Sequence, residues 1–296
     1  MDEMIYAVSL NDSSENFDLA AEMLSALEFD FSSWEDKENP RVVHSVYFFD
    51  EESRQAGVER IRESIEIWKE FGVNITDIST LDIKKEDWAE VWKKYFDIIH
   101  VSEKLVIKPS WLEYDAKPGQ AVVEIDPGMS FGTGQHATTL FCLEMIDCLA
   151  DDPEVKSMLD AGCGSAILTI AGAKMGYGPI DCFDYDPDAV MIAAENLELN
   201  HVSGITPTVA DAAVYQGRKE GYDFVCANIL GHLLKAYRRN IITWVRPGGY
   251  LALAGILTRE FDDLSKAFTE LGFEEIRRGT LKEWTSGLFR KTGENR

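Results

Sequence analysis

The sequence predicts an α/β protein with two domains, a small α+β domain followed by a larger domain around a mostly parallel, seven-stranded sheet. Three observations support this prediction. The 296 residues exceed what one compact core usually holds. Apolar spacing predicts the order βαββαβ over residues 1–80, and from residue 121 onward short apolar runs alternate with helical patterns. Such alternation favours parallel strands that are covered by helices on both faces.

The first domain, residues 1–80, shows strand-like runs separated by two amphipathic helical patterns. Ala20 and Leu24 fall on one face of the first helical pattern, and Ile61 and Ile65 fall on one face of the second. The order of these elements is the ferredoxin-like pattern. The expected strands lie at 4–10, 29–34, 42–49 and 73–78.

Residues 81–120 are expected to join the two domains as a linker helix and an irregular strap. Apolar residues recur at helical spacing in the first half of this segment, and prolines interrupt the second half. We expect Trp88 and Trp92 to pack against one of the domains rather than to stack on bases.

The second domain, residues 121–296, contains seven strand-like runs with helical patterns between them. A sheet of this kind binds ligands at the carboxyl ends of its strands. The expected strands lie at 157–159, 180–183, 205–209, 222–227, 250–254, 273–277 and 284–290.

The chain is strongly acidic, with 29 Lys and Arg against 52 Asp and Glu and a net charge of -23. This charge repels phosphate backbones and anionic membrane surfaces, so we do not expect direct binding of nucleic acid or membranes. The first 100 residues are the more acidic part, which suits either general solubility or a basic protein partner.

The chain lacks a signal-peptide pattern, and a cytoplasmic monomer is expected. The cysteines and histidines do not have the spacing of metal ligands, so no metal site is expected.

The sharpest signal for a ligand site is the run Asp160-Ala-Gly-Cys-Gly-Ser-Ala166 between a strand and a helix. Glycine at 162 and 164 would let a ligand approach the backbone and would leave the amide groups of the helix N-terminus facing it. Ile167 stands where a dinucleotide fingerprint would have its third glycine, which disfavours nicotinamide or flavin binding. Taken alone, the turn is equally consistent with a structural role.

Acidic residues follow the next two strands of the predicted sheet. Asp184 follows the run at 180–183, where a carboxylate can accept two hydrogen bonds from a ribose diol. Asp186 precedes a proline and is expected to cap the next helix. Asp211 either accepts a hydrogen bond from an adenine amino group or simply shapes a turn.

Two polar features complete the predicted site. Asn228 ends the apolar run at 222–227, so its amide must find a partner, and a substrate N–H or the backbone of the next helix could supply it. The glycine-rich loop at 126–139 carries Phe131, Thr133 and Thr139. Its length and its hydroxyl and amide groups predict a lid over a small polar ligand.

These motifs resemble a known family. Asp160-Ala-Gly-Cys-Gly-Ser with Asp184 is similar to the cofactor site of class I S-adenosylmethionine-dependent methyltransferases, which have a Rossmann-like fold. Phe131-Gly-Thr-Gly-Gln-His-Ala-Thr-Thr139 and Asn228-Ile-Leu make nearly the whole chain similar to the ribosomal protein L-eleven methyltransferase family, PrmA. The resemblance implies that the second domain binds S-adenosylmethionine. The positions it implies for cofactor contacts are Thr139, Gly162, Asp184 and Asn228, to which the residue patterns above add Phe131, Thr133, Gly164 and Asp211.

The resemblance also implies a substrate, a basic ribosomal protein that the front domain holds and that is methylated on lysine or N-terminal amines. The acidic front of the chain suits such a partner. The chain departs from the usual family pattern at Gln135 and Ala137 in the loop, at Ala166 in the glycine turn, and at Gly231 after Asn228-Ile-Leu. The four implied contact positions are intact, whereas the loop and the neighbours of Asn228 are expected to shape the acceptor pocket.

A sulfonium methyl donor requires an uncharged acceptor nitrogen, and deprotonating a lysine of pKa about 10.4 costs roughly 4.6 kcal/mol at pH 7. Asn228 is the expected catalytic residue because its neutral amide can accept an N–H bond without stabilising an ammonium ion. Ile229 and Leu230 offer no stacking face for a flat base, which favours an aliphatic amine. The alternatives are methylation of another protein or a small amine, and a catalytically silent binding module.

Overall fold

The computed structural model describes residues 4–13, 20–21, 23–24, 27, 29–36, 41–84, 96–126 and 136–293. The chain divides into two compact units, Met1–Phe96 and Asp97–Arg296. Trp88 and Trp92 of the expected linker helix lie outside the described residues.

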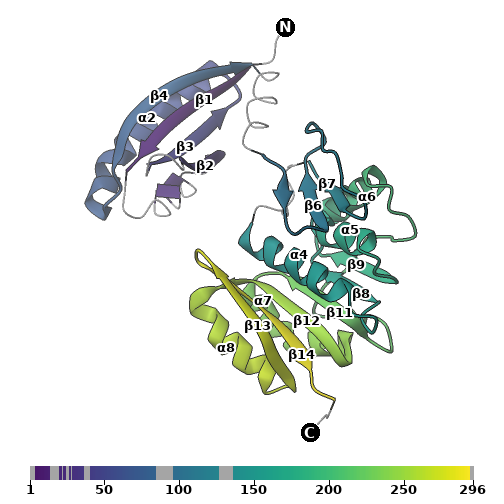
Figure 1. Cartoon of the computed structure of the whole chain (residues 1–296). Helices are drawn as coiled ribbons and strands as arrows, with labels where there is room; N and C mark the ends of the chain where they lie inside the picture. The colour runs from purple at the N-terminus through teal and green to yellow at the C-terminus, as the bar shows by residue number, and fades with distance from the viewer. Residues whose placement is uncertain are drawn as a thin grey trace. The chain divides into compact units, whose positions relative to one another are not determined.

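The first unit contains a four-stranded antiparallel sheet in the order β2-β3-β1-β4, with helix α2 (Glu51–Trp68) packed against it (Figure 1). Helical residues 20, 21, 23 and 24 lie between β1 and β2 in the chain, and a short 3-10 helix, η1 (Lys69–Phe71), follows α2. This strand order is that of the ferredoxin-like pattern. The strands are β1 (Met4–Asp12), β2 (Phe31–Asp36), β3 (Arg41–Phe48) and β4 (Ile75–Lys84).

Helix α2 forms where the sequence provides both a cap and an apolar stripe. The Asp50 side chain accepts a hydrogen bond from Ser53 N at 2.7 Å, which satisfies one of the free amide groups of the first turn. Ile61, Ile65 and Trp68 are buried at helical spacing and pack with Val8 of β1 in one core cluster. This core is separate from the cores of the second unit.

The second unit is built on the seven-stranded sheet β10-β9-β8-β11-β12-β14-β13, in which only β14 runs antiparallel to its neighbours. The mostly parallel, Rossmann-like sheet expected from the sequence is therefore confirmed. The strands are β8 (Met158–Ala161), β9 (Ile180–Asp184), β10 (Thr208–Val209), β11 (Tyr222–Asn228), β12 (Val245–Leu257), β13 (Phe273–Leu281) and β14 (Trp284–Lys291).

Helices cover both faces of this sheet (Figure 1). Side chains alternate between the faces along β11: Phe224 and Cys226 join the core under α4, α5 and α6, whereas Val225 and Ala227 join the core under α7 and α8. None of the helices in the described part of the chain is long and apolar enough to cross a membrane. The helices are α4 (Ala137–Ala150), α5 (Ile167–Lys174), α6 (Pro187–Leu199), α7 (Gly231–Trp244) and α8 (Thr258–Thr269).

The strap differs from the sequence-based expectation, because residues 97–126 fold with the second unit. They form a small sheet of β5 (Ile99–His100), β6 (Leu105–Lys108) and β7 (Ala121–Glu124). Leu105, Ile107 and Val123 of this sheet belong to the same core cluster as residues of α4 and α5. The Asn200 side chain holds β7 by accepting from Glu124 N at 2.8 Å and donating to Glu124 O at 2.6 Å.

Candidate functional site

The glycine turn lies between the end of β8 and the start of α5. Gly162 has φ +75° and Gly164 has φ +50°, a region that L-residues rarely adopt. A Cβ on Gly162 would also clash with the Ile229 side chain. The amide groups of Gly162 and Cys163 donate to Phe183 O at 2.9 and 3.0 Å, which ties the turn to β9. The turn is thus held against β9, and the Ile229 side chain fills the space next to Gly162.

Asp184 ends β9 beside this turn. Its Oδ2 accepts from Gly164 N at 2.8 Å, and its Oδ1 accepts from Asp186 N at 3.0 Å. The structure therefore brings together two residues that the sequence singled out separately. Each carboxylate oxygen can accept a further bond, as a ribose diol would require. Asp186 caps α6, as predicted, by accepting from Asp188 N at 2.9 Å.

Asn228 lies at the carboxyl end of β11, next to the first turn of α4. Its Nδ2 approaches Thr139 Oγ1 at 3.5 Å, and Thr139 is buried. The Asn228 Oδ1 atom is buried, and no described residue donates a hydrogen bond to it. The capping alternative for Asn228 is wrong, because Leu230 is the N-cap of α7 and no side chain caps that helix. An unsatisfied buried acceptor costs about 1–3 kcal/mol, so the site favours a ligand that donates to it.

Asp160 lies beneath the glycine turn and is fully buried. Its Oδ2 accepts from Thr169 N at 3.1 Å and Thr169 Oγ1 at 2.7 Å, while Oδ1 has no donor among the residues that the structure describes. Burial raises the pKa of Asp160 to about 7 against the opposing effect of the Thr169 bonds, and the charge of Asp184 raises it further. A carboxyl group that titrates near neutrality is typical of functional sites.

The remaining predicted site residues are Asp211, Phe131 and Thr133. Asp211 shapes a turn: its Oδ1 accepts from Ala213 N at 2.8 Å, and its backbone oxygen accepts from Tyr215 N at 2.9 Å. Contact between Asp211 and an adenine ring stays a prediction. Phe131 and Thr133 lie outside the described residues, as does Gln135, whereas Ala137 is the first residue of α4.

Two aromatic residues near the site were not singled out from the sequence. His136 is the N-cap of α4, and its Nδ1 lies 2.7 Å from Thr138 Oγ1. Its ring packs edge-on against Trp284, with ring centroids 5.0 Å apart. Burial lowers the pKa of His136, although the Glu283 charge opposes this, so the ring is neutral at pH 7. The motif around His136 offered a signal, but Trp284 gave none because it begins an ordinary strand pattern.

The chain is similar in sequence to known proteins. The family model of the ribosomal protein L11 methyltransferase (PrmA) matches residues 11–292. The ribosomal protein L11 methyltransferase of Alkaliphilus oremlandii is 36% identical over 239 residues, which cover 80% of this chain and 75% of that protein. The protein of the same name from Geotalea uraniireducens is 41% identical over 219 residues, covering 70% of this chain and 69% of that protein.

Solved structures include a similar protein. The crystal structure of ribosomal protein L11 methylase from Lactobacillus delbrueckii subsp. bulgaricus superposes with a TM-score of 0.58 at 25% sequence identity. The match covers 67% of this chain and 99% of that chain.

Proposed function

Because the chain belongs to the ribosomal protein L11 methyltransferase (PrmA) family, we propose that it transfers methyl groups from S-adenosylmethionine to lysine or N-terminal amines of that basic ribosomal protein. The observation that carries the proposal is the buried Asn228 Oδ1, which has no donor in the described part of the chain. An amine N–H is the group that would satisfy it.

The residues around the glycine turn fit the proposed cofactor. Asp184 would accept from the ribose hydroxyls, and the backbone of the glycine turn, which Asp184 contacts through Gly164 N, would lie beside the ligand. Thr139 and Asn228 would border the reacting end of the ligand, since their side chains meet at 3.5 Å. When bound, S-adenosylmethionine supplies a methyl group on a positively charged sulfur that leaves as a neutral thioether.

Asn228 would act by positioning the acceptor rather than by removing a proton. The incoming amine reaches the site uncharged after losing its proton to solvent, and it donates one N–H to Asn228 Oδ1 while its lone pair faces the methyl carbon. Bound S-adenosylmethionine would supply the methyl group in line with that lone pair, and the methylated ammonium would release its proton to solvent. A neutral amide at 228 is suited to this sequence because it adds no charge that would hold the amine in its protonated form.

The neighbours of Asn228 favour an aliphatic amine. Ile229 is partly buried against the core and Leu230 is exposed, so neither presents an aromatic face on which a base or a planar amide could stack. We therefore propose lysine side chains and the N-terminal amine as acceptors, in preference to glutamine or adenine.

The front unit is proposed to hold the substrate. Residues 1–100 carry 10 basic and 24 acidic residues, which favours association with a basic protein and disfavours direct binding of nucleic acid. The proposed division of labour is substrate recognition by residues 1–80 and catalysis by residues 121–296.

Mass spectrometry of purified ribosomal protein L11 after incubation with enzyme and S-adenosylmethionine tests the proposal. We expect added methyl groups on lysine side chains or on the N-terminal amine. Methylation confined to glutamine residues, or no methylation at all, would contradict it.

The variant Asn228→Asp tests the role of the neutral amide. A carboxylate there should raise the pKa of the bound amine by about 1 to 3, so kcat at pH 8 should fall by about 10- to 1000-fold and recover at higher pH. The control Gln216→Glu adds the same charge at an exposed position and should leave kcat unchanged. A pH profile of Asn228→Asp that coincides with that of the native enzyme would refute the role given to Asn228.

A further inference from the structure

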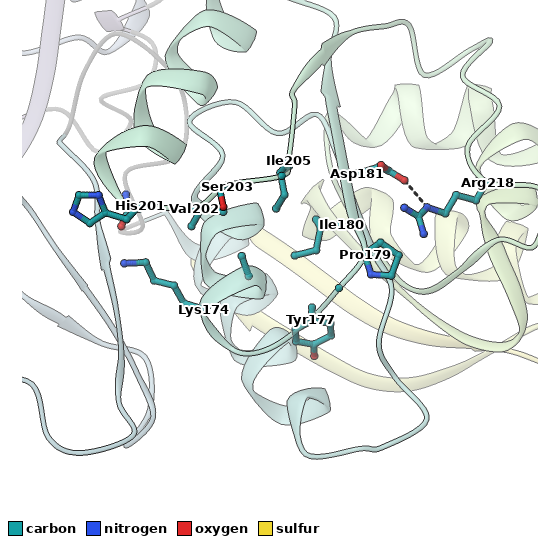
Figure 2. A pocket seen from close by; sticks show the side chains of 14 residues that line it. Lys174, Tyr177, Pro179, Ile180, Asp181, His201, Val202, Ser203, Ile205 and Arg218 are labelled. Atoms are coloured by element: carbon teal, nitrogen blue, oxygen red, sulfur yellow. Dashed lines mark hydrogen bonds and ion pairs between the residues drawn. The ribbon is translucent and has the colours of Figure 1, made fainter.

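A pocket of about 480 Å³ lies at the amino end of β9, whereas the candidate site lies at the carboxyl ends of the strands. The candidate site uses residues at the carboxyl ends of the strands, such as Asp184 and Asn228, whereas the pocket surrounds the start of β9 at Pro179 and Ile180 (Figure 2). The last residue of α5, the loop after α6 and Arg218 complete its walls. All of these elements belong to the second unit.

Three aliphatic side chains lie in the middle part of the pocket, which Asn200 and Ser203 also line. Figure 2 shows Ile180, Val202 and Ile205 between its two ends. Tyr177 also lines it, and the Tyr177 hydroxyl is already satisfied because it donates to Ile146 O at 2.7 Å. These apolar side chains can cover a flat or aliphatic body of a ligand.

One end of the pocket carries Arg218. Its Nε donates to Asp181 Oδ2 at 2.6 Å, and the same oxygen accepts from the Tyr222 hydroxyl at 2.7 Å. The guanidinium carbon of Arg218 lies 5.5 Å from the centre of the Tyr222 ring, and in Figure 2 the terminal nitrogens point toward the side of the pocket near Pro179. A guanidinium edge matches the two oxygens of a phosphate or carboxylate.

The other end carries Lys174 and His201, which Figure 2 places together and away from Arg218. The Lys174 ammonium donates to Val122 O at 2.7 Å, and burial lowers its pKa, as does the charge of Lys108. Glu124 raises that pKa but already pairs with Lys108. An anion seated beside Lys174 would offset this desolvation.

His201 has φ +57° just after α6, where Val202 N donates to Leu197 O and His201 N donates to Glu198 O. This is the left-handed C-terminal position that glycine usually occupies. The imidazole of His201 therefore lies at this end of the pocket although its backbone is strained. A glycine would adopt this conformation more easily.

We propose that this pocket binds a small organic dianion, meaning a ligand with two anionic groups, phosphate or carboxylate, that are separated by an apolar body. Arg218 and Lys174 at the two ends, with Ile180, Val202 and Ile205 between them, favour this chemistry over a neutral ligand or one with a single anionic group. The net charge of the chain opposes anions at long range, but salt screens that field within about 10 Å at 0.1 M ionic strength. The proposal does not depend on the methyl transfer, because the two sites lie at opposite ends of the strands.

Isothermal titration calorimetry tests the proposal with the full chain saturated with S-adenosylhomocysteine, so that the cofactor site is closed to the probe. Adenosine 3′,5′-bisphosphate tests the phosphate form of the ligand, azelate tests the carboxylate form, and adenosine is the uncharged comparison. We expect at least one dianion to bind and adenosine not to bind. Absence of binding by both dianions, or equal binding of adenosine, would overturn the proposal.

Variants assign the binding to this pocket. Arg218→Gln and Lys174→Met should each weaken dianion binding by about tenfold or more, the loss expected for a charge-assisted hydrogen bond. His201→Gly should also weaken it while relieving the backbone. The control Arg239→Gln removes an exposed charge from α7 and should leave the affinity unchanged. If Arg218→Gln does not fold, Lys174→Met and His201→Gly decide the matter, and native affinity in both would overturn the proposal.

Discussion

Replacing Asp160 by asparagine should stabilise the protein and weaken cofactor binding at the same time. The native carboxyl is fully buried, and its Oδ1 has no donor in the described residues, while Thr169 donates twice to Oδ2. An asparagine has nearly the same shape, and its amide oxygen can keep both bonds from Thr169. The substitution therefore removes the buried charge without removing the packing.

The size of the stabilisation follows from the pKa of Asp160. Burial raises this pKa from 3.8 to about 7, so the folded state binds the proton more tightly than the unfolded state does. This contribution to the free energy of unfolding is fully present below about pH 4 and is lost as pH rises through about 7. At about 1.4 kcal/mol for each pKa unit, the total loss is about 4 kcal/mol. Asparagine avoids this loss, but we expect a cost of about 1–3 kcal/mol for burying its amide N–H without an acceptor. The net effect should be a gain of roughly 1–3 kcal/mol at pH 8 and a loss of roughly 1–3 kcal/mol at pH 4.

Urea unfolding of the cofactor-free protein at pH 5 and pH 8 measures this effect, and calorimetry measures the affinity for S-adenosylmethionine. The native protein should lose stability between the two pH values, and Asp160→Asn should lose little. Cofactor affinity of the variant should fall, because the ligand is a cation and the carboxylate lies beneath its proposed site. The control Asp263→Asn alters a surface carboxylate whose pKa the Lys235 hydrogen bond lowers, and it should change neither quantity by much. A variant that is less stable than the native protein at pH 8 would refute the reasoning.

Three further predictions concern the glycine turn and the front unit. Gly162→Ala should destabilise the protein by at least about 2 kcal/mol, from left-handed strain and the clash with Ile229, and should abolish cofactor binding in calorimetry. Ala166→Gly should change the free energy of unfolding by less than about 0.5 kcal/mol, because relief of the strain at φ +62° and loss of a buried methyl nearly cancel. A clear shift in its urea midpoint would contradict that balance. Removal of residues 1–96 should leave cofactor affinity nearly intact but abolish methylation of ribosomal protein L11, and equal loss of both would exclude the proposed division of labour.

Sequence patterns predicted most of the fold because periodicity is a local property. The continuous apolar run of β11 and the helical stripe of α2 can both be recognised within short stretches of sequence. The strap sheet was missed because β5 has two residues and β6 four, and their pairing is set by burial against distant helices. The strand expected at 205–209 is shorter in the structure, because only Thr208–Val209 pairs with β9.

The candidate site was predictable in part. Motifs gave Gly162, Gly164 and Asp184, and the structure adds that the last two share a hydrogen bond. The unsatisfied oxygen of Asn228 could not be predicted, because it depends on which groups three separate elements leave nearby. For the same reason the contact between His136 and Trp284, which joins distant parts of the chain, had no local signal.

We propose that the site at the carboxyl ends of β8, β9 and β11 binds the methyl donor. A crystal structure with S-adenosylhomocysteine tests it most directly. We predict density for the nucleoside against Asp184 and the glycine turn, with its sulfur end near Thr139 and Asn228. An empty site, or the same ligand seated only in the pocket beside Lys174, would contradict the proposal.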